Sequence, residues 1–184
     1  MEYSAHYASP LGSIMLASDG ENLTGLWNAG QKYFAASVKS GTAENPDLPV
    51  FAVVKKWLEA YFAGRKPGVS GLPLAPAGSE FRKAVWELLC GIPYGKCTTY
   101  GKIAQSMATR MNKTTMSSQA VGGAVGHNPI SIIIPCHRVI GSNGSLTGYA
   151  GGIDKKIKLL EFEGIGTFTR ANGDVYCRPD SVYA

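Results

Sequence analysis

The chain has 184 residues, of which 45% are hydrophobic, and it carries a formal net charge of +5. No stretch approaches the roughly 20 apolar residues of a membrane-spanning helix, and no basic segment precedes a long apolar one at the N-terminus, so we expect a cytoplasmic protein without a membrane partner. The four cysteines form no C-x-x-C pair and the three histidines lack metal-ligand spacing to them, so we predict neither a disulfide framework nor a metal site.

The net charge is unevenly distributed along the chain. Residues 1–76 hold six basic and six acidic residues, so the whole excess of +5 lies in residues 77–184. This asymmetry fits a polyanionic partner such as DNA, although basic domains are common and charge alone does not decide the question. We expect residues 1–76 to add little to affinity for DNA.

The first half of the chain predicts a small sheet and one helix. Residues 3–27 form short apolar runs interrupted by turn residues at 10–12 (PLG) and 19–20 (DG), which is typical of short strands. Residues 51–62 place apolar side chains at helical spacing. The first half therefore combines strands with a helix.

A Pro- and Gly-rich segment over residues 64–78 follows and shows no periodicity, which predicts a linker. We therefore expect an N-terminal α/β domain with its linker over residues 1–76 and a C-terminal domain over residues 77–184.

The C-terminal domain begins with helical signals. Ser79 can cap a first helix that ends near Gly91, and Thr98 or Thr99 can cap a second. Two short helices joined by a turn in a basic context suggest a helix-turn-helix, although any helical domain offers such pairs.

A third predicted helix is rich in glycine. It starts at Ser117 or Ser118 and contains Gly122, Gly123 and Gly126, each of which costs about 1 kcal/mol relative to alanine. Glycines there let the helix backbone approach something closely. Packing within the protein and contact with a partner explain this equally well from sequence.

The segment over residues 130–138 (ISIIIPCHR) carries the most specific chemical signal. An apolar run suited to a buried strand ends at Pro135, and Cys136, His137 and Arg138 follow without a gap. A thiol becomes a strong nucleophile only as the thiolate, which a neighbouring base can generate. Because adjacent residues of an extended chain point apart, His137 can serve Cys136 only through a backbone turn or a water. A buried cysteine that only fills space is the plain alternative.

A last helix is predicted after a tight turn at residues 143–144 (NG). Asp154 is its expected cap. Apolar residues at helical spacing give it an inner face, and Glu161 and Glu163 both flank that face. Periodicity cannot choose between these two carboxylates. The tail over residues 167–184 is expected to be peripheral.

Residues 118–129 (SQAVGGAVGHNP), 135–139 (PCHRV) and 148–152 (GYAGG) together resemble the O6-alkylguanine-DNA alkyltransferases, also called methylated-DNA–protein-cysteine methyltransferases. A looser resemblance covers residues 9–164. It implies an α+β fold, with a small antiparallel sheet and helix of ribonuclease H-like type and a C-terminal helical winged helix-turn-helix domain that binds DNA and accepts the alkyl group.

The resemblance also implies the activity. An alkyl group moves irreversibly from O6 of guanine, and from O4 of thymine, to the protein's own cysteine, so each molecule reacts once. No cofactor is implied, the partner is double-stranded DNA containing O6-alkylguanine, and the protein acts as a monomer.

Four residues match the family's catalytic positions. Cys136 is the implied acceptor, and His137 takes its proton through a water. Glu163, rather than Glu161, holds the histidine, and Tyr100 is the acid that neutralises the departing guanine. Without the resemblance, Tyr100 would be read as a core tyrosine.

Two further sets follow from the same resemblance. The implied DNA-binding residues, most of them on a recognition helix in the minor groove, are Gln119, Ala120, Gly122, Gly123 and Arg138. The implied pocket for the flipped base comprises Asn128, Val139, Tyr149, Ala150 and Gly151. We expect Asn128 to shape the turn beside the site, and Arg138 to give structural support rather than to take part in the chemistry.

Two positions depart from the family's pattern. Ala150 stands where a serine is frequent, which removes one side-chain contact to guanine O6. Gln119 stands where an arginine commonly fills the gap left by the flipped base.

Two other classes of function compete with this reading. A Cys-His thiol hydrolase would turn over and would need an oxyanion hole that the sequence does not reveal. A non-catalytic binder of alkylated DNA would have another residue in place of Cys136, so the presence of this cysteine disfavours it.

Overall fold

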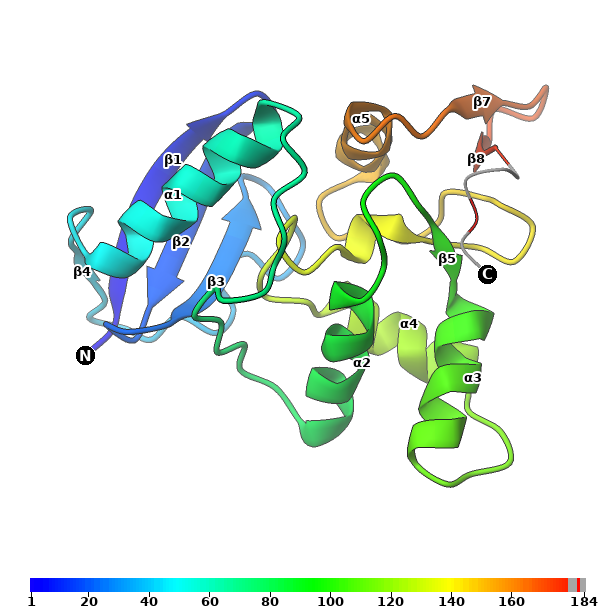
Figure 1. Ribbon diagram of the computed structural model, residues 1–184, viewed down its shortest axis with the longest axis horizontal. Coiled ribbons are helices and arrows are strands. Elements are labelled where there is room, and N and C mark those ends of the chain that lie inside the picture. Colours follow the sequence, from blue (N-terminus) through cyan, green and yellow to red (C-terminus); the bar gives the residue numbers. More distant parts are fainter. Residues whose placement is uncertain (179–181, 183–184) are drawn as a thin grey trace.

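The computed structural model describes residues 1–178 and 182 and has the expected α+β architecture (Figure 1). Its first half is a four-stranded sheet of order β3-β2-β1-β4, antiparallel except where β4 joins β1 in parallel. The strands are β1 (Tyr3–Ser9), β2 (Gly12–Ser18), β3 (Leu23–Asn28) and β4 (Ala43–Glu44). Helix α1 (Pro49–Phe62) crosses one face of the sheet and buries its apolar side there. The strands and the helix predicted in this half are confirmed.

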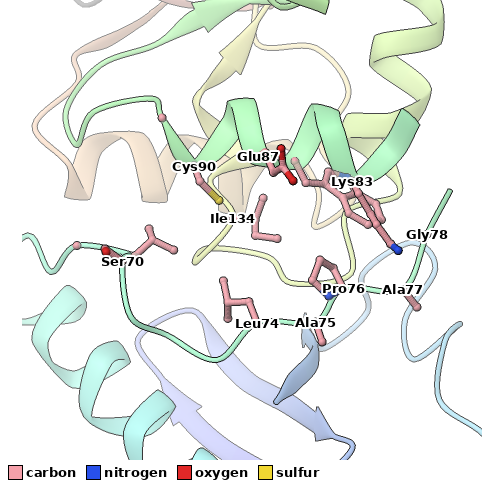
Figure 2. Close-up of a pocket in the computed structure, with 14 residues that line it drawn as sticks. Ser70, Leu74, Ala75, Pro76, Ala77, Gly78, Lys83, Glu87, Cys90 and Ile134 are labelled. Atoms are coloured by element: carbon pink, nitrogen blue, oxygen red, sulfur yellow. The ribbon is translucent and has the colours of Figure 1, made fainter. Parts of the chain in front are cut away.

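The Pro- and Gly-rich segment after α1 is irregular, as predicted. Its one strand-like contact is the parallel bridge from Leu74 to Leu23 on β3. The segment runs back past the sheet and lines a cavity together with α2 (Glu80–Cys90) (Figure 2).

Helices α2, α3 (Tyr100–Arg110) and α4 (Ser118–Gly126) pack against one another in the second half. The caps resolve both sequence ambiguities: Thr99 rather than Thr98 caps α3, and Ser117 rather than Ser118 caps α4. Each cap oxygen accepts a backbone N–H of the first turn, which the helix itself leaves unpaired. The three short helices predicted after the linker thus correspond to α2, α3 and α4.

Small strands complete the second half. Strand β5 (Thr98–Thr99) pairs in parallel with β6 (Val139–Ile140), and β7 (Thr167–Thr169) forms a hairpin with β8 (Val175–Cys177). Helix α5 (Ile153–Phe162) lies between β6 and β7 in the chain. Within the described part of the tail, Cys177 of β8 packs into a small cluster with Cys97 and Ile140.

The strand predicted just before Pro135 is wrong. The apolar run is a buried turn, in which Ile132 has a φ of +70°, followed by the 3-10 helix η1 (Cys136–Arg138). A positive φ at a β-branched residue is costly and persists only where the surroundings enforce it. Here the backbone of Leu26 on β3 bonds both Pro129 and Ser131, which holds the start of the turn against the sheet, and Ile134 N closes the turn by donating to Ile130 O (3.1 Å).

The predicted cap of the last helix is also wrong. Gly152 is the N-cap of α5, with a φ of +91° that only glycine adopts readily, and Asp154 lies in the first turn. An acid at that position still interacts favourably with the helix dipole.

One hydrophobic core joins the two halves. It contains Leu16 and Leu58 of the first half and Val85, Ile133 and Leu159 of the second. Within the described residues, every helix is too short or too polar to pass through a lipid bilayer.

Candidate active site

Cys136 lies at the start of η1, inside the core, with 5% of its surface exposed. The buried turn before it brings the chain up through the core, and η1 then turns the backbone so that consecutive side chains do not alternate as in a strand. Local backbone bonds fix this geometry, because Cys136 N donates to Ile134 O (2.8 Å) and Arg138 N to Pro135 O (3.0 Å).

Asn128 contacts the Cys136 sulfur directly. Its Nδ2 donates to Cys136 Sγ (3.1 Å) and to Ile134 O (2.8 Å), while its Oδ1 accepts from Ile130 N (3.0 Å). Burial raises the pKa of the Cys136 thiol, and the Asn128 hydrogen bond opposes that rise. Asn128 therefore shapes the turn, as expected, and also offers a donor to a thiolate.

His137 is fully buried and presents one free ring nitrogen. Its Nε2 lies 2.7 Å from Glu163 Oε1, whereas Nδ1 has no hydrogen-bond partner among the described residues. Burial lowers the pKa of His137, so its ring is neutral at pH 7. An ionised carboxylate only accepts hydrogen bonds, so Nε2 carries the proton and Nδ1 is left to accept one. No hydrogen bond joins the thiol to the imidazole.

Glu163 sits at the C-cap of α5 with a fully buried side chain. Its carboxylate accepts from His137, from Arg138 Nε (2.8 Å) and Nη2 (2.9 Å), from Tyr61 Oη (2.8 Å) and from Gly95 N (3.2 Å). Burial alone would raise the pKa of Glu163, but its bonds to His137 and Arg138 hold that pKa below its usual range. Glu161 is exposed instead and accepts from Thr167.

Arg138 does not lie with the other predicted DNA-binding residues. It is 7% exposed. Its Nε and Nη2 donate to the two carboxylate oxygens of Glu163, and its Nη1 donates to Ile92 O (2.6 Å). All three bonds are internal, which fits the structural support expected of Arg138 better than a contact with DNA.

Lys156 of α5 is a buried group that sequence reasoning missed. Its Nζ donates to Val139 O (2.6 Å) and Thr147 O (3.0 Å), which ties β6, directly after η1, to the loop before Tyr149. Burial lowers the pKa of Lys156 to about 8, while electrostatic attraction to Cys136 acts the other way. The available signal was its position three and four residues before Leu159 and Leu160, on the apolar stripe of the helix.

A cavity of about 650 Å³ opens above this network. Of the predicted residues it is lined by Tyr100, Gln119, Gly122, Gly123, Tyr149 and Ala150. The Tyr100 hydroxyl donates toward Thr147 O and Gly148 O (3.3 Å each), and burial raises the pKa of Tyr100 to about 12. A tyrosine in that state holds its proton at neutral pH.

The other predicted residues lie off this cavity. Asn128, Val139 and Gly151 are buried behind its wall, and Ala120 is exposed on the first turn of α4. Tyr149 and Tyr100 lie close enough to Cys136 to interact electrostatically with its sulfur. The thiol therefore sits beneath the pocket rather than at its surface.

The glycines of α4 are not required by packing within the protein. A Cβ added at Gly123 or Gly126 would meet nothing within 4 Å, and one at Gly122 would make ordinary contact with Tyr100 at 3.9 Å. Of the two explanations that the sequence left equal, internal close packing is thus excluded.

A larger cavity, of about 1070 Å³, lies between the linker and α2 (Figure 2). The Cys90 sulfur points into it beside Ile134, and Lys83 and Glu87 stand along the helix above. Burial raises the pKa of Cys90, and none of the residues around the cavity is a histidine that could deprotonate it. This cavity therefore lacks the groups for thiol chemistry.

Known proteins match both halves of the chain. Residues 3–76 match the family description "6-O-methylguanine DNA methyltransferase, ribonuclease-like domain", and residues 80–165 match its "DNA binding domain". A methylated-DNA–protein-cysteine methyltransferase of Haemophilus influenzae is 41% identical over 169 residues, covering 89% of this chain and 87% of its own. One of Methanosarcina acetivorans is 45% identical, covering 88% and 98%. A crystal structure of Mycobacterium tuberculosis OGT in complex with DNA superposes with a TM-score of 0.76 at 39% identity, covering 88% and 92%.

Proposed function

This chain belongs to the 6-O-methylguanine DNA methyltransferase family, and we propose that Cys136 is the residue that accepts the alkyl group from DNA. The activity is that of its relatives, transfer from methylated DNA to a protein cysteine in a single-turnover repair reaction, and the chain binds DNA. The observation that carries the proposal is the free Nδ1 of a buried, neutral His137, next in the chain to Cys136 and held by Glu163.

The reaction follows from these groups. The Cys136 proton passes to His137 Nδ1 through a bridging water, and Glu163 stabilises the imidazolium that forms. The thiolate, with Asn128 donating to it, attacks the alkyl carbon in line with the carbon–oxygen bond. The S–C bond forms as that bond breaks, and the electron pair leaves with guanine. Tyr100 supplies a proton to the departing base.

The substrate we propose is guanine alkylated at O6 within duplex DNA, bound by one copy of the chain. Since the target base lies inside a duplex, it must leave the stack to reach a thiol beneath a pocket. The α4 glycines expose backbone that nothing in the protein covers, which suits a helix laid against DNA. Tyr149 and Ala150 line the pocket into which the base would turn.

Gln119 and Ala150, the two residues that depart from the family's pattern, both line the cavity. Gln119 is the second residue of α4 and lines the cavity mouth, where we propose it fills the gap left by the flipped base. Ala150 offers no hydroxyl, so contacts to guanine O6 would come from backbone amides of its loop.

The test is mass spectrometry after incubation with a duplex containing O6-methylguanine. We expect a gain of one methyl group per molecule on Cys136, and no gain in Cys136→Ala, which should still bind the duplex. A methyl group on Cys90, Cys97 or Cys177 would contradict the assignment. Repeated turnover would point to a thiol hydrolase, and DNA binding without any adduct to a non-catalytic binder.

A further inference from the structure

The cavity above Cys136 has a wall that comes from the first half of the chain. Lys32 and Tyr33, in the loop after β3, line it opposite Gln119 and Tyr149. Lys32 N donates to Ala150 O (2.8 Å), and Lys155 Nζ donates to Ala29 O (3.0 Å). The start of the loop is therefore hydrogen-bonded to the second half of the chain at two points, at Ala150 of the cavity and at Lys155 of α5.

Tyr33 adopts a costly conformation to face this cavity. Its φ is +60°, a region that aromatic residues seldom occupy, and its side chain remains 41% exposed. Its ring stacks on His127 with centroids 4.2 Å apart and planes inclined by 20°, and Lys32 Nζ lies 5.0 Å from the Tyr33 ring centroid. Backbone strain of this kind persists where surrounding contacts enforce it, and it concentrates at ligand sites.

His127 fixes this stack to α4. Its Nδ1 lies 2.7 Å from Gly123 O, and a carbonyl only accepts, so Nδ1 donates. The ring is thus oriented by the same turn of helix that presents Gly123. An ammonium group, an exposed aromatic ring and a histidine are then held together at the mouth of the pocket, beside an uncovered helix backbone.

We propose that Lys32, Tyr33 and His127 form a DNA-contact site that holds the sugar–phosphate backbone of the extrahelical nucleotide. The Lys32 ammonium pairs with a phosphate, and the Tyr33 ring and hydroxyl support the sugar and the flanking phosphate. The site rests on the proposed function, since the nucleotide it holds is the one whose base reaches Cys136. It departs from the expectation that residues 1–76 add little to DNA affinity, because the position of one lysine outweighs a net charge of zero.

The first arm of the test uses salt dependence. Each neutralised phosphate adds about 0.9 to the slope of log affinity against log salt concentration. Lys32→Ala should reduce that slope by roughly this amount on an O6-methylguanine duplex, whereas Lys56→Ala, an exposed lysine on α1, should leave slope and transfer rate unchanged. Equal slopes for wild type and Lys32→Ala would overturn the phosphate contact.

The second arm compares substrates. Tyr33→Ala should lower the ratio of the duplex transfer rate to the rate with free O6-benzylguanine by on the order of tenfold, because only the duplex brings a backbone. Tyr33→Phe keeps the stack on His127 and should lose much less. An unchanged ratio for Tyr33→Ala would refute the proposal while wild-type alkylation of Cys136 left the proposed function standing; no adduct on wild-type Cys136 would refute both.

Discussion

Gly123→Ala should make the protein more stable and a poorer binder of DNA. Gly123 lies in the middle of α4, has a helical backbone, and an added Cβ would meet nothing within 4 Å. Replacing a helical glycine by alanine without a clash stabilises by about 0.5–1 kcal/mol, since the unfolded chain loses conformational freedom. For a chain of this size we expect the melting temperature to rise by roughly 1–4 °C.

The same methyl group would stand between α4 and the duplex. Forcing an extra methyl into a close-packed contact typically costs about 1–3 kcal/mol, so affinity for an O6-methylguanine duplex at fixed salt should fall by roughly 5- to 150-fold. Reaction with free O6-benzylguanine, which needs no duplex, provides the control and should change far less. The measurements are thermal unfolding, equilibrium binding and single-turnover rates.

If α4 approaches DNA at Gly123, the substitution must raise thermal stability and lower affinity for the duplex. A variant that is stabilised and binds duplex like wild type would show that α4 does not approach DNA at Gly123. A destabilised variant would show that packing within the protein requires glycine at position 123.

Three other changes test the network. Glu163→Gln should destabilise by about 3 kcal/mol by leaving Arg138 buried without its counter-charge, and should slow transfer, whereas exposed Glu161→Gln should change stability by less than about 0.5 kcal/mol. The folded state lowers the pKa of Glu163, so the carboxylate's contribution to the free energy of unfolding is full above about pH 4.3 and declines as the pH falls through the lowered pKa. Measuring the free energy of unfolding at a series of acidic pH values should show this decline in wild type and not in Glu163→Gln. Lys156→Met should slow transfer and abolish a break near pH 8 in the rate profile. Gln119→Arg should speed alkyl transfer from duplex DNA or tighten duplex binding, with little change in the reaction with free O6-benzylguanine. Equal duplex rates for wild type and Gln119→Arg would show that Gln119 does not fill the gap left by the flipped base.

The sequence predicted the features that depend on interactions between residues close together in the chain, such as turns and helix caps. Turn residues delimited the three main strands, and Ser79 was identified as a cap because its side chain can satisfy an otherwise unpaired N–H. The failures arose where distant contacts dominate. Residues 130–134 look like a strand, but they form a turn with a positive φ at Ile132, and the start of that turn is hydrogen-bonded to Leu26, more than a hundred residues away in sequence.

The site was predicted by resemblance more than by pattern. Periodicity left Glu161 and Glu163 equivalent, and the structure separates them because Glu163 ends α5 and turns inward to Arg138. The Tyr61 hydroxyl on that carboxylate comes from 102 residues away, which no local signal in the sequence could reveal. Lys156 was hidden for another reason: a lysine on an apolar stripe is usually assumed to reach solvent, and here it ends on two carbonyls.

Burial explains how a protein that can react only once avoids wasting its thiol. At rest Cys136 is nearly inaccessible and its pKa is raised, so little thiolate exists to meet stray electrophiles. The groups that favour the thiolate are nevertheless in place: Asn128 on the sulfur, the ammonium of Lys156, and His137 with Nδ1 free. In the proposed reaction, the flipped base completes the arrangement, because it enters the cavity lined by Tyr149 and brings the electrophilic carbon to a nucleophile otherwise kept neutral. On this proposal reactivity is conditional on a flipped nucleotide, which the proposed DNA contacts on α4 and at Lys32 and Tyr33 would hold in place.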